Sequence, residues 1–187
     1  DYQPLRPQAM ARLEQLRTAQ GASLPPRLKA EITRELQRLE LVVEMIAILE
    51  AERDAIVEDA ASTHINAKKI RDLHKLKAIG PEFAAVLVGE IFHRNFNNRR
   101  QLASYVGYAP SPFQSGNVAH DQGISKAGNS KGRTTGIELA WLWLRYQPGS
   151  DLSAWFQARV GATKGRIRRI AIVALARKLM VALWRLS

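Results

Sequence analysis

Apolar residues recur at helical spacing in the first third of the chain. After the Pro25-Pro26 break they follow one another at intervals of four, three, four and three residues: Ile32, Leu36, Leu39, Val43 and Ile46. This spacing predicts a long helix with a heptad seam, as in a coiled coil. The strict repeat lasts only about two heptads, so an amphipathic helix packed inside one domain is the alternative.

A second helix and a sharp turn are predicted next. We expect the long helix to fray within residues 58–67 and a new helix to run to about Leu76. The following Gly80-Pro81 step, between two helical patterns, resembles a helix-hairpin-helix, whose glycine turn lets backbone N–H groups approach a DNA phosphate. Gly80 and the neighbouring Lys75 and Lys77 are therefore candidate nucleic-acid contacts. An ordinary tight turn gives the same pattern.

The last third of the chain again has helical periodicity. Short and medium helices are predicted around Arg100–Val106 and over Thr134–Tyr146, the latter stopping at Pro148-Gly149. A final helix is predicted over Arg166–Leu183. Its rotation of about 100° per residue places three arginines opposite the apolar side chains. These arginines are Arg166, Arg169 and Arg177, facing away from Ile172, Leu175 and Leu179.

Between these helical regions, residues 110–129 read PSPFQSGNVAHDQGISKAGN and have little apolar periodicity. A connection of this length in a compact domain is usually either functional or disordered. The chain as a whole is 46% hydrophobic and 24% charged over 187 residues, which suffices for a real core and makes disorder a poor explanation. We therefore predict a long functional loop.

Composition also limits the chemistry that the chain can carry. It has no cysteine, which excludes disulfides and thiolate metal sites. We see no apolar run of about 18 residues and no secretion leader, so we expect no membrane association. Because the sequence starts at Asp1 rather than Met, we take it for a piece of a longer protein.

The net charge of +11 is distributed very unevenly. Residues 1–61 carry 8 Lys and Arg against 11 Asp and Glu, whereas residues 62–187 carry 20 against 6, giving net charges of −3 and +14. After Asp151 the chain contains no acid at all. Such a field of one sign favours a polyanion as partner, most commonly nucleic acid. A merely solvated basic surface is the alternative.

Patterns for metal binding or general acid–base catalysis are weak. The histidines at 64, 74, 93 and 120 lack metal-ligand spacing, and the six acids after residue 61 form no local cluster for Mg²⁺. We therefore predict no metal site in this chain. Adjacent residues such as His120-Asp121 seldom converge as a catalytic pair. Ser115, before Gly116, is either a nucleophile on an exposed turn or a plain turn residue.

Three motifs in order give the sequence a family resemblance. They read IGPEFAAVLVGEI, then RRQLASYVGYAPSPFQSGNVAHDQGISKAGN, then IAIVALARKLMVALW. Together they resemble the C-terminal transposase domain of the "IS one-ten" insertion-sequence transposases, a family that includes the Piv/MooV-type DNA invertases. The resemblance covers about residues 70–187, and the preceding seam is similar in character to that family's coiled-coil region.

The resemblance implies roles for individual residues. Ser115 in FQSG falls on the family's nucleophilic serine, which attacks a DNA phosphodiester and forms a phosphoserine link, and Gly116 gives its turn a close backbone approach. A second motif in the same loop is matched by Lys126, Gly128 and Asn129, and the basic pair of the last helix by Arg177 and Lys178.

We expect the loop to place Ser115 at a DNA backbone among three donors that stabilise charge growing on a phosphate. These donors are Lys126, Asn129 and Arg133. Two positions depart from the family's pattern, Thr134-Thr135 and Asp121-Gln122.

The resemblance also implies parts that lie outside this sequence. Family members carry an N-terminal RuvC-like domain whose four acidic residues bind Mg²⁺, so we expect Mg²⁺ to serve the complete enzyme through that domain. A serine hydroxyl is a weak nucleophile until a base or a metal activates it. A structured guide RNA is a further partner that the resemblance implies, in a bacterial or archaeal cytoplasm.

We therefore predict a mainly α protein with two parts: a helical, coiled-coil-like oligomerisation segment over residues 1–66, forming a dimer or tetramer, and a compact basic domain over 67–187. The second part combines the helix-hairpin-helix-like turn with the long functional loop. The predicted function is DNA binding, cleavage and strand transfer, as the serine-bearing part of a transposase that is inactive alone. The alternatives are a non-catalytic DNA-binding module, in which Ser115 is only a turn residue, and a coiled-coil interaction scaffold.

Overall fold

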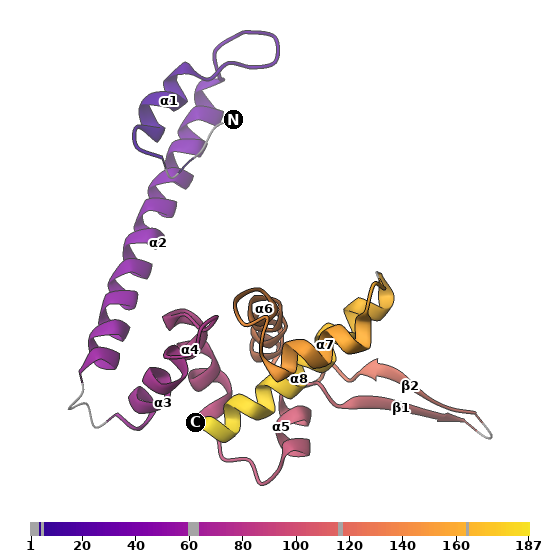
Figure 1. Ribbon diagram of the computed structural model, residues 1–187. Helices are drawn as coiled ribbons and strands as arrows, with labels where there is room; N and C mark the ends of the chain where they lie inside the picture. Colours follow the sequence, from indigo (N-terminus) through magenta and orange to yellow (C-terminus); the bar gives the residue numbers. More distant parts are fainter. Residues whose placement is uncertain (1–3, 5, 60–63, 116–117, 164) are drawn as a thin grey trace. The chain divides into compact units, whose positions relative to one another are not determined.

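The computed structural model describes residues 4, 6–59, 64–115, 118–163 and 165–187 (Figure 1). Helices make up most of its regular structure, which confirms the mainly α prediction. In chain order the elements are α1 (Ala9–Gln15), α2 (Pro26–Glu58), α3 (Ile65–His74), α4 (Pro81–Leu87), the π-helical turn η1 (Val88–Phe92), α5 (Arg99–Val106), β1 (Pro110–Ser115), β2 (Val118–Ile124), α6 (Ser130–Tyr146), α7 (Asp151–Val160) and α8 (Arg166–Leu186).

The chain divides into two compact units, Asp1–Ala55 and Ile56–Ser187. The first holds α1 and most of α2, and the second holds every later element. Within the described residues, none of the helices combines the length and the apolar character needed to cross a bilayer.

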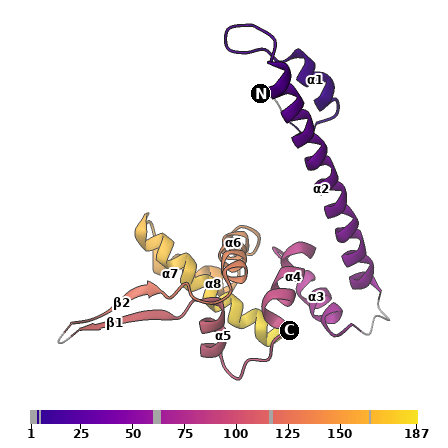
Figure 2. The same cartoon turned by 180° about the vertical axis from the view of Figure 1, so that it is seen from behind.

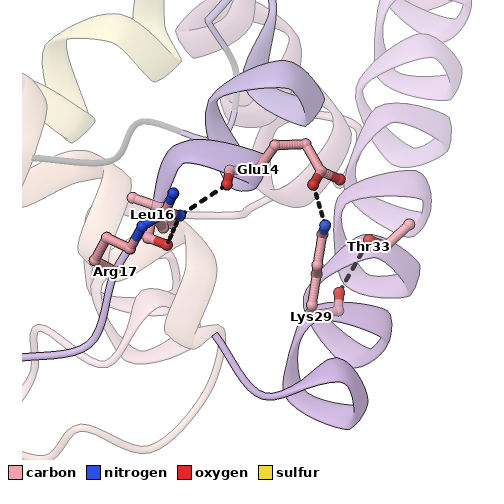
Figure 3. A network of polar contacts seen from close by, with 5 residues as sticks. All are labelled: Glu14, Leu16, Arg17, Lys29 and Thr33. Carbon is pink, nitrogen blue, oxygen red and sulfur yellow. Dashed lines mark hydrogen bonds and ion pairs between the residues drawn. The ribbon is translucent and has the colours of Figure 1, made fainter. Parts of the chain in front are cut away.

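An ion pair joins α1 to the start of α2, and further hydrogen bonds lie within each of the two segments (Figure 3). The Lys29 ammonium pairs with the Glu14 carboxylate. Arg17 Nη1 donates to the carbonyl oxygens of Glu14 at 3.1 Å and of Leu16 at 3.0 Å, and Thr33 Oγ1 donates to the Lys29 carbonyl at 2.9 Å. Among the residues of this unit that the structure describes, the buried apolar side chains are Ala9, Leu13 and Leu36.

The heptad positions of α2 differ in their exposure. Leu36 is buried and Leu39 is half-buried, whereas Val43 is 41% and Ile46 is 50% exposed. Other large apolar side chains in the same part of the helix are exposed as well: Leu41, Val42, Met45, Ile48 and Leu49. The predicted long helix is confirmed, and two of the five positions of its predicted seam, Val43 and Ile46, are exposed.

The second unit is built around α8. The predicted division of this helix is confirmed for its first part, because its apolar side is buried while Arg166 and Arg169 are exposed. The third predicted arginine, Arg177, is half-buried. Helices α3, α5, α6 and α7 all pack against it, with α6 and α7 lying beside it in both views (Figures 1 and 2). Burying each large side chain of this face stabilises the fold by about 1.5–3 kcal/mol. They are Ile172, Leu175, Leu179, Met180 and Leu183.

The stretch predicted as an irregular loop is mainly a β-hairpin, so that part of the prediction was wrong. Strand β1 pairs with β2 in antiparallel register, from Pro110 opposite Ile124 to Ser115 opposite Val118. Only two residues separate the last pair, and a Gly-Asn pair in that position is a hairpin signal. The prolines at 110 and 112 hide the strand pattern, since proline cannot donate to a ladder, and the register is irregular between them.

Two more elements test the sequence reading. Helix α7 was not predicted, although Ser150 caps it by accepting from the Ser153 N–H. The turn between α3 and α4 lies where it was predicted, with Gly80 as the N-terminal cap of α4 and Pro81 as its first residue. Its role as a helix-hairpin-helix stays a prediction.

Candidate nucleic-acid interface

The base of the hairpin is fixed to the C-terminal end of α5 by backbone contacts. The N–H groups of Ser125, Lys126 and Asn129 donate to the carbonyls of residues 109, 107 and 105, at 2.8, 3.2 and 2.8 Å. Two glycines make this approach possible. A Cβ on Gly107 would lie 2.2 Å from the Ala127 carbonyl oxygen, and one on Gly128 would lie 2.1 Å from that of Tyr105.

Both glycines also have positive φ angles, +82° for Gly107 and +93° for Gly128, which favour glycine over other residues. The predicted supporting role of Gly128 thus has a physical basis in the fold. Gly116, the other predicted support, lies outside the described residues.

Asn129 joins the hairpin to two other elements. Its Oδ1 accepts from the Gly132 N–H at 2.7 Å and caps α6, while its Nδ2 donates to Glu90 Oε2 at 2.9 Å. Lys131 Nζ lies 3.2 Å from the other Glu90 oxygen, and Tyr105 Oη donates to the Glu90 carbonyl at 3.0 Å. The hydrogen bond from Asn129, followed by that from Lys131, lowers the pKa of Glu90 below its ordinary value.

Arg133 is also used inside the fold. Its Nη1 donates to the Lys126 carbonyl at 2.8 Å, and its Nη2 donates to Ser130 Oγ at 3.2 Å. The Arg133 carbonyl in turn accepts from Tyr108 Oη at 2.7 Å, and burial raises the pKa of this phenol. Asn129 and Arg133 therefore hold the hairpin base, and their predicted contact with nucleic acid stays a prediction.

Ser115 is the last residue of β1 and faces Val118 in the register, at the end of the hairpin away from this base. The hairpin extends out of the helical body, on the side away from α3 and α4 (Figures 1 and 2). Lys126, Asn129 and Arg133 lie at the opposite end of the hairpin. The structure therefore does not bring Ser115 among these three donors, as the sequence reading expected.

A basic groove of about 670 Å³ runs between α8 and the starts of α5 and α7. Five cationic side chains line it: Arg99, Arg100, Arg177, Lys178 and Arg185. Among the described residues none of the five forms an ion pair with an acid. Cations without counterions on one surface fit the phosphates of a nucleic acid.

The sequence reading found part of this groove. Arg177 and Lys178 were predicted, whereas Arg99, Arg100 and Arg185 were not. Arg185 follows Arg177 by eight residues, about two helical turns, so the spacing could have predicted that both lie on the same side of the helix. Arg99 and Arg100 reach the groove through the packing of α5 on α8, for which the sequence has no local signal.

The remaining predicted contacts are divided between two places. Lys126, Arg166 and Arg169 lie around a second groove beside Arg177, described below. Lys75 and Lys77 lie at the α3–α4 turn, where Lys75 Nζ pairs with Asp72 at 2.8 Å, and line neither groove. A Cβ added to Gly80 would meet nothing within 4 Å, so packing does not require glycine there.

Comparison with known proteins shows that part of this chain is similar to a family of transposases. Residues 70–154 match the model of the IS116/IS110/IS902 transposase family. The chain is 52% identical over 193 aligned residues to the Sinorhizobium fredii (strain NBRC 101917 / NGR234) protein named "Putative transposase y4rJ", covering 98% of this chain and 48% of that protein. A second protein of the same strain, "Putative transposase y4qE", is 43% identical over 53 residues, which is 28% of this chain and 13% of that protein.

Residues 70–154 therefore match the transposase domain of the IS116/IS110/IS902 family, which confirms the resemblance found in the motifs. The chain spans about half the length of the relative that it matches throughout. The match includes α3 from Ile70, the hairpin with Ser115 and its anchoring contacts, and it ends early in α7.

The Asn129 contacts lead to a prediction about stability. Asn129→Ala removes the cap of α6 and should lower the free energy of unfolding by about 1 kcal/mol, the usual cost of a lost cap. Urea unfolding measures this change. Asn95→Ala, at an exposed position outside these contacts, is the control and should stay within about 0.5 kcal/mol. Equal effects of the two substitutions would contradict the role of Asn129.

The lowered pKa of Glu90 adds a pH dependence. A depressed carboxyl pKa contributes stability above the ordinary value of 4.5, and this contribution is lost as pH falls through the folded-state pKa. Because the bond from Asn129 is the first cause of the shift, Asn129→Ala should weaken the loss of stability in acid. NMR titration of the Glu90 carboxyl should show its pKa rising toward 4.5 in the variant.

Proposed function

We propose that this chain is the serine-bearing part of a DNA transposase, which binds DNA through its basic surface and uses Ser115 as the nucleophile for strand cleavage and transfer. One observation carries the proposal. The transposase-family segment presents Ser115 at the end of a projecting hairpin whose base adjoins a helix with uncompensated cations. Both parts fit a phosphate backbone.

The proposed reaction conserves atoms and charge. The Ser115 oxygen forms a bond to the phosphorus of a DNA phosphodiester, and the bond from phosphorus to one sugar oxygen breaks. The serine proton is lost to solvent and the leaving sugar oxygen takes one up, which gives a phosphoserine and a free sugar hydroxyl. Attack by a sugar hydroxyl of another strand on this phosphoserine forms a new phosphodiester and releases the serine. The cations of the two grooves lie at the base of the hairpin and on α8, where they would bind neighbouring phosphates of the same strand.

The complete protein is expected to need more than this chain. By family resemblance, a RuvC-like domain with four acids supplies Mg²⁺, and a structured RNA guides the reaction. Among the described residues, no three His, Asp or Glu side chains gather to form a metal site, so the ligands present here do not fit such an ion. We therefore assign Mg²⁺ to the other domain and assign DNA binding and the serine to this chain.

Binding to DNA is the first test. Duplex affinity should fall steeply with salt, with each neutralised phosphate adding about −0.9 to the slope of log K against log [salt]. Arg185→Gln, in the basic groove, should weaken binding and make that slope shallower by about 1. Fluorescence anisotropy at several salt concentrations measures both quantities. Arg34→Gln, on an exposed position of α2, is the control and should change neither. Salt-independent binding, or none at low salt, would rule out the proposed DNA interface.

Ser115→Ala tests the catalytic role and distinguishes an enzyme from a binding module. The substitution should leave duplex affinity within about twofold, because phosphate binding is spread over many cations. Strand transfer by the longer protein should be lost, since no neighbouring group replaces a covalent nucleophile. A recombination assay with a marked donor, together with denaturing gels for the protein–DNA adduct, measures the reaction.

Ser125→Ala is the matched control for that substitution, because Ser125 is an exposed serine at the other end of the hairpin. It should retain recombination and the adduct. If Ser115→Ala also keeps them, the nucleophile is another group. If it loses DNA binding together with activity, Ser115 supports the structure rather than attacking the strand.

The uncovered part of α2 supports a proposal about assembly. We expect this apolar row, defined by Leu41, Val42, Val43, Met45, Ile46, Ile48 and Leu49, to pair with a second copy of the chain. Val43→Glu combined with Ile46→Glu should lower the mass measured by light scattering to that of a monomer and leave the second unit folded. Glu44→Gln keeps the row and should keep the wild-type mass. A wild-type protein that is monomeric at high concentration would refute this proposal.

A further inference from the structure

A second groove lies between the base of the hairpin and the first half of α8. Its volume is about 580 Å³, within the range of roughly 300–1,000 Å³ that small-ligand sites occupy. Half-buried Ile124 and Val173 and the 56% exposed Ile170 give it an apolar lining. We call it the hairpin-base groove. It adjoins the basic groove, because Ala174 and Arg177 line both.

Four cations surround this apolar lining: Lys126, Arg166, Arg169 and Arg177. Among the described side chains, no acid lines the groove and none pairs with these four cations. Tyr108 contributes its buried ring, while its hydroxyl is bonded to Arg133. The groove thus offers an apolar surface together with positive charge.

These two properties select among the possible forms of a polyanion. A paired duplex presents phosphates outward and keeps its base faces stacked inside, so it satisfies the arginines and leaves the apolar lining exposed to water. An unpaired nucleotide presents an apolar base face and a charged phosphate on either side of it. Only the unpaired form matches both parts of the groove.

We propose that the hairpin-base groove binds one unpaired nucleotide of a DNA strand, with the base against Ile124 and Ile170 and the flanking phosphates on the surrounding arginines. This inference rests on the proposed function, which supplies DNA as the partner. From Pro110 to Ser115 an extended strand covers about 17 Å. A DNA strand spaced as in a duplex covers that length with about five nucleotides, so the groove holds the strand at a short, fixed distance from the attacked phosphate.

The test compares two DNA duplexes, one fully paired and one carrying a single unpaired 2-aminopurine bulge, with the 187-residue chain. The wild type should bind the bulged duplex about tenfold more tightly than the paired one, the order of effect expected when apolar surface of one base and of Ile124 and Ile170 is removed from water. Fluorescence anisotropy gives the affinities, and the emission of 2-aminopurine should change on binding.

Ile170→Ser should abolish this preference and leave affinity for the paired duplex within about twofold, because every cation is kept. Ile167→Ser is the matched control: Ile167 is 53% exposed, lies one turn earlier on the same helix and does not line the groove. It should retain the tenfold preference. Circular dichroism verifies that both variants keep the helical fold.

Each outcome decides something. If the wild type binds both duplexes equally and with steep salt dependence, the groove assignment fails and the proposed DNA binding stands. If it binds neither, both fail. Equal loss of preference in Ile167→Ser and Ile170→Ser would also overturn the groove. A bulged RNA duplex bound more tightly than the bulged DNA would overturn the assignment of the groove to DNA.

Discussion

The close backbone contact between residues 125–129 and the end of α5 is the constraint on which the rest of the interface depends. It works only because Gly107 and Gly128 lack side chains, since a Cβ on either would lie about 2 Å from a carbonyl oxygen across the contact. The contact fixes where β2 ends and where α6 begins. The hairpin, whose first strand ends at Ser115, therefore projects from a fixed base. This base also forms one side of the hairpin-base groove on α8.

Charge on α8 is the second organising feature. Its buried side packs against four other helices. Its outer side carries arginines that form no ion pair with an acid among the described residues. Unpaired cations repel one another and bring the free protein little stability. A bound phosphate backbone would neutralise these charges, and the relief of their repulsion would add to the free energy of the proposed DNA binding. The same helix thus organises both the core and the proposed DNA surface.

The sequence predicted most of the helices, though not α1 or α7, and the site only in part. Spacing alone was sufficient for α2 and for the two sides of α8, because a helix repeats its pattern locally. The hairpin was missed since Pro110 and Pro112 obscure its strand pattern, although the Gly-Asn pair signalled it. The bond from Asn129 to Glu90, 39 residues away, was not predicted. Such long-range partners leave no periodic trace in a sequence.

Amide hydrogen exchange by NMR tests the anchoring of the hairpin base most directly. The N–H groups of Ser125, Lys126 and Asn129 donate to carbonyls near the end of α5, so their exchange should be slowed to a degree comparable with amides in the first turns of α6. Gly128→Ala should remove that protection at all three positions while the centre of α8 stays protected. Exchange of these amides at the rate of an unfolded chain in the wild type would contradict the anchored hairpin and the site built on it.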